Sequence, residues 1–265
     1  MRAEMAFVIL SLLLSKCMVA QTPSWDESDA FKKQASMGKT GSNSGEWRKV
    51  VENRSASSIV ALEAVYHCAS SGYFKHVDYT HVHDSLEAYG TDNDVPPGAS
   101  IEITAYDPEL CPGKVEAVIF ADGHSEGDPQ FVNDLYMRRR GIYQILDVIR
   151  AHVDRIASQQ ETPQSVIEFL TKLDGSNGLN MKVDISERAG MSYAIGLVKM
   201  MLAAGPMTSW RVPSDSTLDR LPRASAVMLD LNVSREQAQA IIFSKKLAEW
   251  SSDLGKNLEP SPVAR

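Results

Sequence analysis

The sequence predicts an α+β protein in which an antiparallel β-sandwich is followed by a helical domain. Two patterns predict this order. Short segments of alternating apolar and polar residues, separated by turn residues, fill positions 46–126, as is typical of antiparallel sandwiches. Apolar residues at helical spacing fill positions 127–256, as is typical of packed helices. The period changes within residues 115–156, where a strand, an acidic loop (residues 122–128) and a long helix follow one another.

The composition is that of an ordinary globular protein. The chain has 265 residues, of which 43% are hydrophobic and 23% are charged, enough for one large or two modest domains with real cores. The net charge is -7 and the isoelectric point is about 5.4. This acidic balance argues against a nucleic acid partner and against adhesion to anionic lipid by charge alone.

The first twenty residues have the pattern of an export signal. Arg2 supplies a positive start, and residues 5–14 form an apolar run that is too short to cross a bilayer as a helix. Cleavage is expected after residues 15–20, although Met18 is unusual three positions before the cut. The alternative is an uncleaved anchor or a buried strand. We therefore expect a signal peptide over residues 1–20, a secreted or periplasmic protein, and no transmembrane segment after cleavage.

The β-half is expected to contain at least five strands, preceded by a disordered leader. The leader covers residues 21–45, which are polar. The clearest strand covers residues 59–68, where Val60 and Leu62 share one face. Residues 73–83 are polar enough to form a strand at a sheet edge. The remaining strands are expected at residues 47–53, 100–106 and 115–121.

Two turns in the β-half carry a resemblance to a known class of module. Asn53-Arg-Ser precedes the long alternating strand, and Val95-Pro-Pro-Gly-Ala-Ser-Ile-Glu-Ile introduces a later one. With these turns, residues 46–122 resemble the small immunoglobulin-like sandwiches of exported bacterial proteins, here joined to an uncharacterised helical region. The antibody pattern is absent, because no Trp lies between Cys68 and Cys111. The resemblance implies a scaffold or binding module and not a reaction.

The helical half has clear start and stop signals. Asp128 and Pro129 are an N-cap and a first-turn proline, and they open a helix of about 30 residues or some 45 Å. Thr162-Pro163 repeats this pattern, and Ser234 opens a capping box. An apolar helix is expected at residues 185–204, where small residues would allow another helix to approach closely, namely Ala189, Ser192 and Gly196. The tail at residues 257–265 is expected to fray.

Arg138, Arg139 and Arg140 occupy three successive positions of the long helix. Such positions span about 200° of the helix circumference, so they cannot all face solvent if the helix is central. Arg139 lies on the apolar stripe and is predicted to pair with an acid from the β-half or from the acidic loop. The alternative is a patch of arginines that binds an anionic ligand.

Cys68 and Cys111 are the two cysteines that follow the export signal. An even number of cysteines in an exported chain predicts a disulfide, which would contribute about 4 kcal/mol in the chain-entropy view. The alternative is a pair of unpaired buried thiols, because the sequence does not determine how far apart the two residues lie.

Two groups of residues are candidate metal ligands. His81 and His83 share one face of a strand and can hold zinc or copper if further ligands join them. Asp122, Glu126 and Asp128 of the acidic loop offer oxygens to calcium, and His124 offers a nitrogen to a transition metal. The alternatives are structural: a solvated edge strand for the histidines, a turn at Asp122 and a helix cap at Asp128.

No signature of a catalytic nucleophile, a zinc hydrolase or a dinucleotide site is present in the sequence. We therefore expect an exported, non-catalytic binding or structural protein with no cofactor and an unidentified partner, for which an envelope protein or a glycan fits. One alternative is a metal-binding protein or metal-dependent enzyme that uses His81 and His83 or the acidic loop. Another is a hydrolase whose residues converge only in the folded chain.

Overall fold

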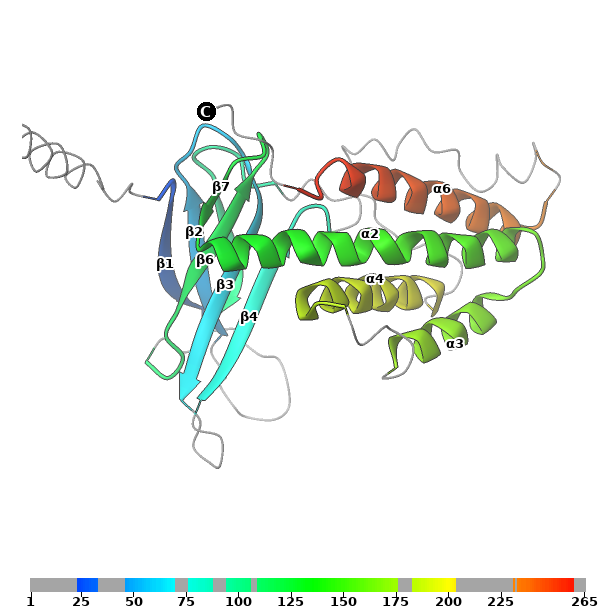
Figure 1. The fold of residues 1–265 in the computed structure, drawn as a ribbon, viewed down its shortest axis with the longest axis horizontal. Helices are drawn as coiled ribbons and strands as arrows, with labels where there is room; N and C mark the ends of the chain where they lie inside the picture. Colours follow the sequence, from blue (N-terminus) through cyan, green and yellow to red (C-terminus); the bar gives the residue numbers. More distant parts are fainter. Residues whose placement is uncertain are drawn as a thin grey trace, which may run out of the picture.

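The computed structural model describes residues 23–32, 46–69, 76–87, 94–105, 109–175, 183–203, 231 and 233–259. In these residues, seven strands form two antiparallel sheets in the first half of the chain, and four helices follow. Figure 1 shows the sheets at one end of the molecule and the helices extending away from them side by side. The expected α+β fold class is confirmed.

The strands form two stacked sheets. One sheet has the order β1-β2-β5 and the other β4-β3-β6-β7. The constant-type immunoglobulin sandwich places the fourth strand beside the fifth, whereas here the fourth strand pairs with the third. The first sheet consists of β1 (Trp25–Lys32), β2 (Glu46–Asn53) and β5 (Ser100–Ala105). The second consists of β3 (Ile59–Ala69), β4 (His76–Asp84), β6 (Gly113–Phe120) and β7 (Ser125–Gly127).

Apolar residues from both sheets form one core between them, as expected for alternating strands. On β3 the inward residues are Ile59, Leu62 and Tyr66, whereas strict alternation in the sequence predicts that Val60, and not Ile59, shares the face of Leu62. The pairing register of β3 with β6 shifts between Ile59 and Ala61, and this irregularity places Ile59, and not Val60, in the sandwich core. Their partners from the other strands include Trp25, Val51, Ile103, Val118 and Phe120.

Strand β1 lies within the segment that was expected to be a disordered leader. The expectation rested on the polar composition of residues 21–45, but Trp25 of this segment is buried in the sandwich core. Glu27 also faces inward, where its carboxylate accepts a hydrogen bond from the Val115 backbone N–H (2.9 Å) and binds the buried Lys49 ammonium (3.2 Å). This polar segment can therefore form a strand, because Glu27 has a partner in each of the two sheets.

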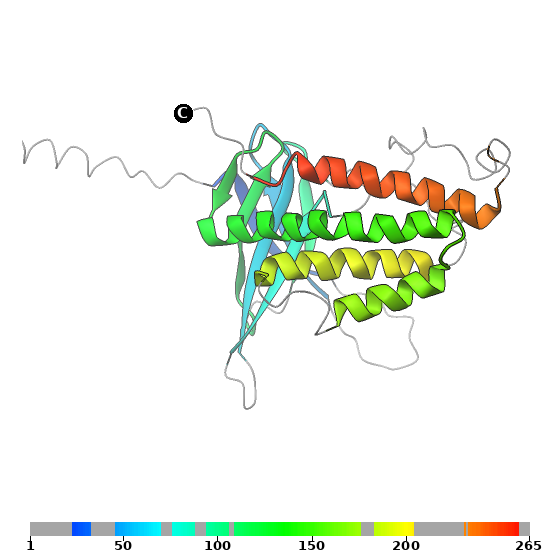
Figure 2. The same cartoon turned by 45° about the vertical axis from the view of Figure 1, so that its right-hand side comes forward.

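Helix α2 (Pro129–Ala157) joins the two halves of the molecule. As predicted, Asp128 is its N-cap, and the carboxylate accepts a hydrogen bond from the Gln130 backbone N–H at 2.8 Å. Its first turns pack Leu135 and Tyr136 on the outer face of the β4-β3-β6-β7 sheet, against Ala61, Ala117 and Ile119. Figures 1 and 2 show that the rest of the helix extends beyond the sheet.

The other helices surround the distal part of α2. They are α3 (Pro163–Asp174), α4 (Ile185–Ala203) and α6 (Arg235–Gly255), and their apolar faces meet in a second core with α2. In the two views, α6 lies on one side of α2, and α4 lies on the other (Figures 1 and 2). The predicted caps at Thr162 and Ser234 are both present as capping boxes.

Two glycines allow α2 and α4 to approach closely. A Cβ atom added at Gly141 would lie 1.8 Å from the backbone oxygen of Glu187, and one added at Gly190 would lie 2.0 Å from that of Arg138. Gly196, which the sequence suggested for this role, has no atom within 4 Å of its added Cβ. The close contact on α4 therefore lies at Gly190, next to the predicted Ala189, and not at Gly196.

Cys68 and Cys111 form the predicted disulfide, with an S–S distance of 2.03 Å and Cα atoms 3.9 Å apart. The bond links the end of β3 to the chain just before β6. Among the helices that the structure describes, none combines the length and the apolar character that a membrane crossing requires.

Candidate functional site

The turn at residues 84–87, which follows β4, is held by three helices, and we call it the clasped turn. Arg138 and Arg139 reach it from α2, Tyr193 from α4 and Trp250 from α6. The turn is thus the point where the sandwich meets the helices. We refer to this region, together with the contact of α2 on the outer sheet face, as the joint.

Arg139 and Asp84 form a bidentate ion pair at the centre of the joint. Arg139 Nε donates to Asp84 Oδ2 at 2.6 Å, and an outer nitrogen donates to Oδ1 at 3.0 Å. Both side chains are only 1% exposed. Asp84 Oδ1 also accepts the Leu86 backbone N–H at 2.9 Å. The predicted pairing of Arg139 with an acid from the β-half is confirmed.

Arg138 binds the other end of the clasped turn. Its Nε donates to the buried carboxylate of Glu87, and its guanidinium lies over the Tyr193 ring, 5.4 Å from the centroid. The Tyr193 hydroxyl donates to the Glu87 backbone carbonyl at 3.2 Å. Trp250 Nε1 donates to the Leu86 carbonyl at 2.5 Å. Side chains from α2, α4 and α6 therefore satisfy the polar groups of one short turn.

Glu63 on β3 is a further buried carboxylate in the joint, 6% exposed. The pKa of Glu63 is raised to about 7, first by burial and then by the charges of Asp134 and Glu87, while the charge of Arg138 lowers it. Burial also raises the pKa of Glu87 to about 7, although the charge and hydrogen bond of Arg138 oppose this. Buried carboxylates with raised pKa values are common at functional sites, and they also occur in structural networks.

His81 and His83 lie on β4 opposite Ala64 and Leu62, so their side chains share the face that looks into the sandwich. Both are half-buried. Burial lowers the pKa of His81, and the neighbouring His83 and then Arg48 lower it further. The predicted common face is present. In the described part of the chain, no three His, Cys, Asp or Glu side chains are grouped so that they could hold a metal ion.

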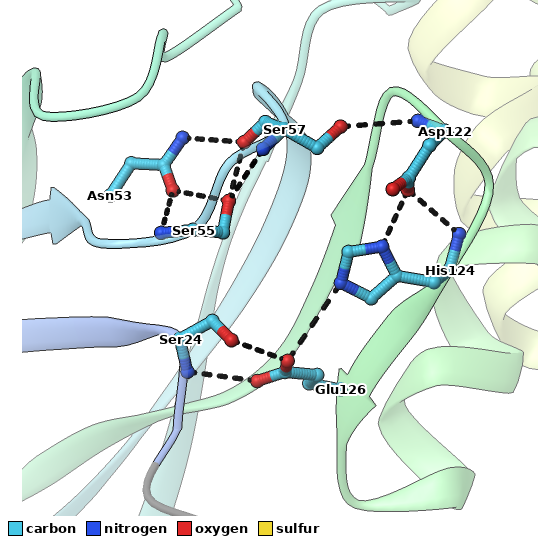
Figure 3. A network of polar contacts seen from close by, with 7 residues as sticks. All are labelled: Ser24, Asn53, Ser55, Ser57, Asp122, His124 and Glu126. Atoms are coloured by element: carbon cyan, nitrogen blue, oxygen red, sulfur yellow. Dashed lines mark hydrogen bonds and ion pairs between the residues drawn. The ribbon is translucent and has the colours of Figure 1, made fainter.

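The acidic loop (residues 122–128) is organised around His124 (Figure 3). His124 Nδ1 lies 2.5 Å from Asp122 Oδ1, and Nε2 lies 3.7 Å from Glu126 Oε1. The imidazole also stacks on the Phe120 ring, with centroids 4.1 Å apart. Asp122 therefore binds His124, whereas Asp128 caps α2, so the structure does not bring these two predicted calcium ligands into one set.

The same loop is tied to two other parts of the sandwich (Figure 3). Glu126 accepts hydrogen bonds from the backbone N–H and the hydroxyl of Ser24, at 2.9 and 2.6 Å. The Asp122 backbone N–H donates to Ser57 Oγ at 3.3 Å. Glu126 thus stands between Ser24 and His124, so the imidazole does not face the hydroxyl. The arrangement suits a structural clamp better than activation of Ser24 as a nucleophile.

A groove lies between the acidic loop and the end of α6, and we call it the tail groove. Its volume is about 570 Å³, and its lining residues include Asp122, Tyr136 and Arg139 on one side and Lys256, Asn257 and Glu259 on the other. A neighbouring hollow of about 530 Å³ shares Tyr136 and Glu259 with it. The helical end of the molecule has a smaller, apolar pocket of about 380 Å³ that includes Val153, Met201 and Phe243.

No protein-family model, no curated protein and no solved structure matches the chain.

Sequence reasoning did not identify Glu63, Asp84 or Glu87 as members of one site. One signal was available for Glu63, because it is the only charged residue in the run from Ile59 to Tyr66. The sequence indicates a turn at Asn53 but no buried contact for its side chain. Its buried amide donates to the Ser57 carbonyl at 2.8 Å and to the Val95 carbonyl at 2.7 Å. This residue therefore connects the two turns on which the resemblance rests.

Proposed function

We propose that the protein is an exported, non-catalytic binding or structural protein in which the sandwich and the helices work as one rigid unit. The observation that carries the proposal is the clasped turn. Its side chains and carbonyls bind α2, α4 and α6 through Arg138, Arg139, Tyr193 and Trp250. Such a junction holds two halves in a constant orientation, which a scaffold or a binding platform needs.

The disulfide supports export. Disulfides persist in oxidising compartments and are rare in reducing ones, and Cys68 is bonded to Cys111. The pattern of residues 1–20 supports the same compartment, either secreted or periplasmic.

The tail groove is the proposed binding surface. Carboxylates from Asp122 and Glu259, the ammonium of Lys256 and the amide of Asn257 lie along it. The groove thus has donors and acceptors of both charges, which favours an uncharged ligand with many hydroxyl groups over a small ion. A glycan has this chemistry, and an envelope protein is the other partner class that fits an exported scaffold.

An oligosaccharide array tests the groove. The purified protein is applied together with Glu259→Trp, which places a large side chain at an exposed groove position. Glu168→Gln, at an exposed position on α3, is the control. The proposal expects glycan binding that is lost in Glu259→Trp and retained in the control. Absence of binding, or binding that is insensitive to Glu259→Trp, rejects the glycan site. Cleavage of an oligosaccharide would show that the protein is an enzyme.

The metal alternative has a separate test. Elemental analysis of protein purified without a histidine tag measures bound zinc, copper and calcium. Our proposal expects no stoichiometric metal. A stoichiometric ion that is lost in His81→Ala or Asp122→Ala would overturn it in favour of a metal protein.

A further inference from the structure

We propose that the joint is a pH-sensitive contact, in which a proton on Glu63 tightens the packing of α2 on the sandwich. The proposal starts from where Glu63 lies. It projects from β3 on the sheet face that α2 covers, and its neighbours on that face, Ala61 and Ala117, are completely buried. An ionised carboxylate at such a position loses its hydration, and this costs free energy unless an opposite charge replaces the water.

Among the described residues around Glu63, the nearby arginines are paired with other carboxylates. Glu87 acts on it from the clasped turn, and Asp134 and Arg138 act on it from α2. Asp84 and Arg139 act on the neighbouring Glu87, and burial and then the charge of Glu87 raise the pKa of Tyr193 on α4. Arg139 binds both oxygens of Asp84, and Arg138 Nε binds Glu87. Two guanidiniums therefore face three buried carboxylates, and Glu63 is the one that neither ion pair includes.

A proton removes this imbalance. When Glu63 is neutral, each guanidinium binds one buried carboxylate, Asp84 or Glu87, and the apolar face between β3 and α2 closes around an uncharged side chain. The pKa of Glu63 is raised to about 7 by burial and by the nearby acids, and the pKa of Glu87 is raised to about 7 as well. The charge of Glu87 is among the causes that raise the pKa of Glu63, so the protonation of one carboxylate affects the other.

The direction of the pH effect follows from these values. In the unfolded chain a glutamate loses its proton near pH 4.5, whereas in the joint it does so near pH 7. The folded state thus binds more protons between these values, so the stabilising contribution is complete below about pH 4.5 and is lost as the pH rises through 7. From pH 6 to pH 8, Glu63 alone should raise the unfolding equilibrium constant about tenfold. Carboxylates with lowered pKa values have the opposite effect.

Urea unfolding at pH 6, 7 and 8 tests the proposal with three proteins. The wild type should become less stable as the pH rises. Glu63→Gln removes the charge but keeps the shape, so it should unfold at a higher urea concentration than the wild type at pH 8 and depend less on pH. Glu168→Gln, an exposed glutamate on α3, should follow the wild type at every pH. If Glu63→Gln is less stable than the wild type at pH 8, or retains the full pH dependence, the proposal is wrong.

A second measurement does not depend on whether a variant folds. The side-chain carboxyl carbon of Glu63 can be followed by NMR in the wild-type protein as the pH is changed. A midpoint near 7 supports the proposal, and a midpoint near the ordinary glutamate value of 4.5 overturns it.

Discussion

Arg139 of α2 and Asp84 of β4 form a two-point ion pair across the boundary between the helices and the sandwich, with N–O distances of 2.6 and 3.0 Å. Both side chains are 1% exposed. A pair at this depth is costly to break, because the remaining partner stays buried with its charge uncompensated. The relationship explains how a cation can occupy the apolar stripe of the central helix, and it leads to the first prediction.

Arg139→Ala should destabilise the protein by about 3–5 kcal/mol, because Asp84 is left as a buried, unpaired charge. The double variant Arg139→Met with Asp84→Leu should recover much of the loss, since no charge then remains unpaired. Urea unfolding of the two variants measures the difference. Equal losses in the single and double variants would show that packing, and not the unpaired charge, sets the cost.

Asp128→Ala should destabilise the protein by about 1 kcal/mol through loss of the N-cap bond to the Gln130 N–H. Asn133→Ala, at an exposed position one turn into α2, should change the stability by less than about 0.5 kcal/mol. Thermal unfolding compares the two. Unchanged stability in Asp128→Ala, combined with loss of a ligand or metal, would make the acidic loop a binding site and not a cap.

Gly141→Ala should destabilise the protein by about 1–3 kcal/mol, as overpacked contacts do, since its Cβ would lie 1.8 Å from the Glu187 backbone oxygen. Gly196→Ala is the matched control on the facing helix, where the added Cβ meets nothing within 4 Å. Alanine is the better helix former by up to about 1 kcal/mol, so this control should be stabilised. If both variants change stability in the same direction, α2 and α4 are not in close contact at Gly141.

Reduction of the Cys68–Cys111 bond should destabilise the folded chain by about 2–4 kcal/mol. The comparison is between thermal unfolding with and without a reducing agent. The double variant Cys68→Ser with Cys111→Ser should behave like the reduced wild type under both conditions. A wild type whose unfolding is insensitive to the reductant would show that the bond does not form in solution.

Some of these features could be predicted from the sequence, because they depend on neighbouring residues or on the hydrophobic pattern. The caps at Asp128, Thr162 and Ser234 are local patterns, because the capping residue and the groups that it binds lie within a few positions of each other. Arg139 was also predictable, since a guanidinium on an apolar stripe must find an acid. The order of sandwich and helices follows from the change in hydrophobic period.

The features that were missed depend on residues far apart in the chain. Arg139 and its partner Asp84 are separated by 55 positions, so the identity of the acid was not predictable. Gly141 is required only because a carbonyl of α4 lies against it. Strand β1 has a polar composition, and a hydrogen bond from the Val115 backbone N–H of the other sheet to the Glu27 carboxylate stabilises it. The position of Ile59 depends on an irregular register with β6.

The central claim is that the joint holds the sandwich and the helices in one orientation. Spin labels are attached to cysteines introduced at exposed Thr80 on β4 and exposed Glu168 on α3, and the distance between the labels reports the orientation of the two halves. Cys17 is replaced by serine so that a chain that retains residues 1–20 is not labelled there. We predict one narrow distance distribution for this labelled chain, and a broader one when Arg139→Ala is added. A broad or two-peaked distribution in the chain with Arg139 intact would contradict the claim.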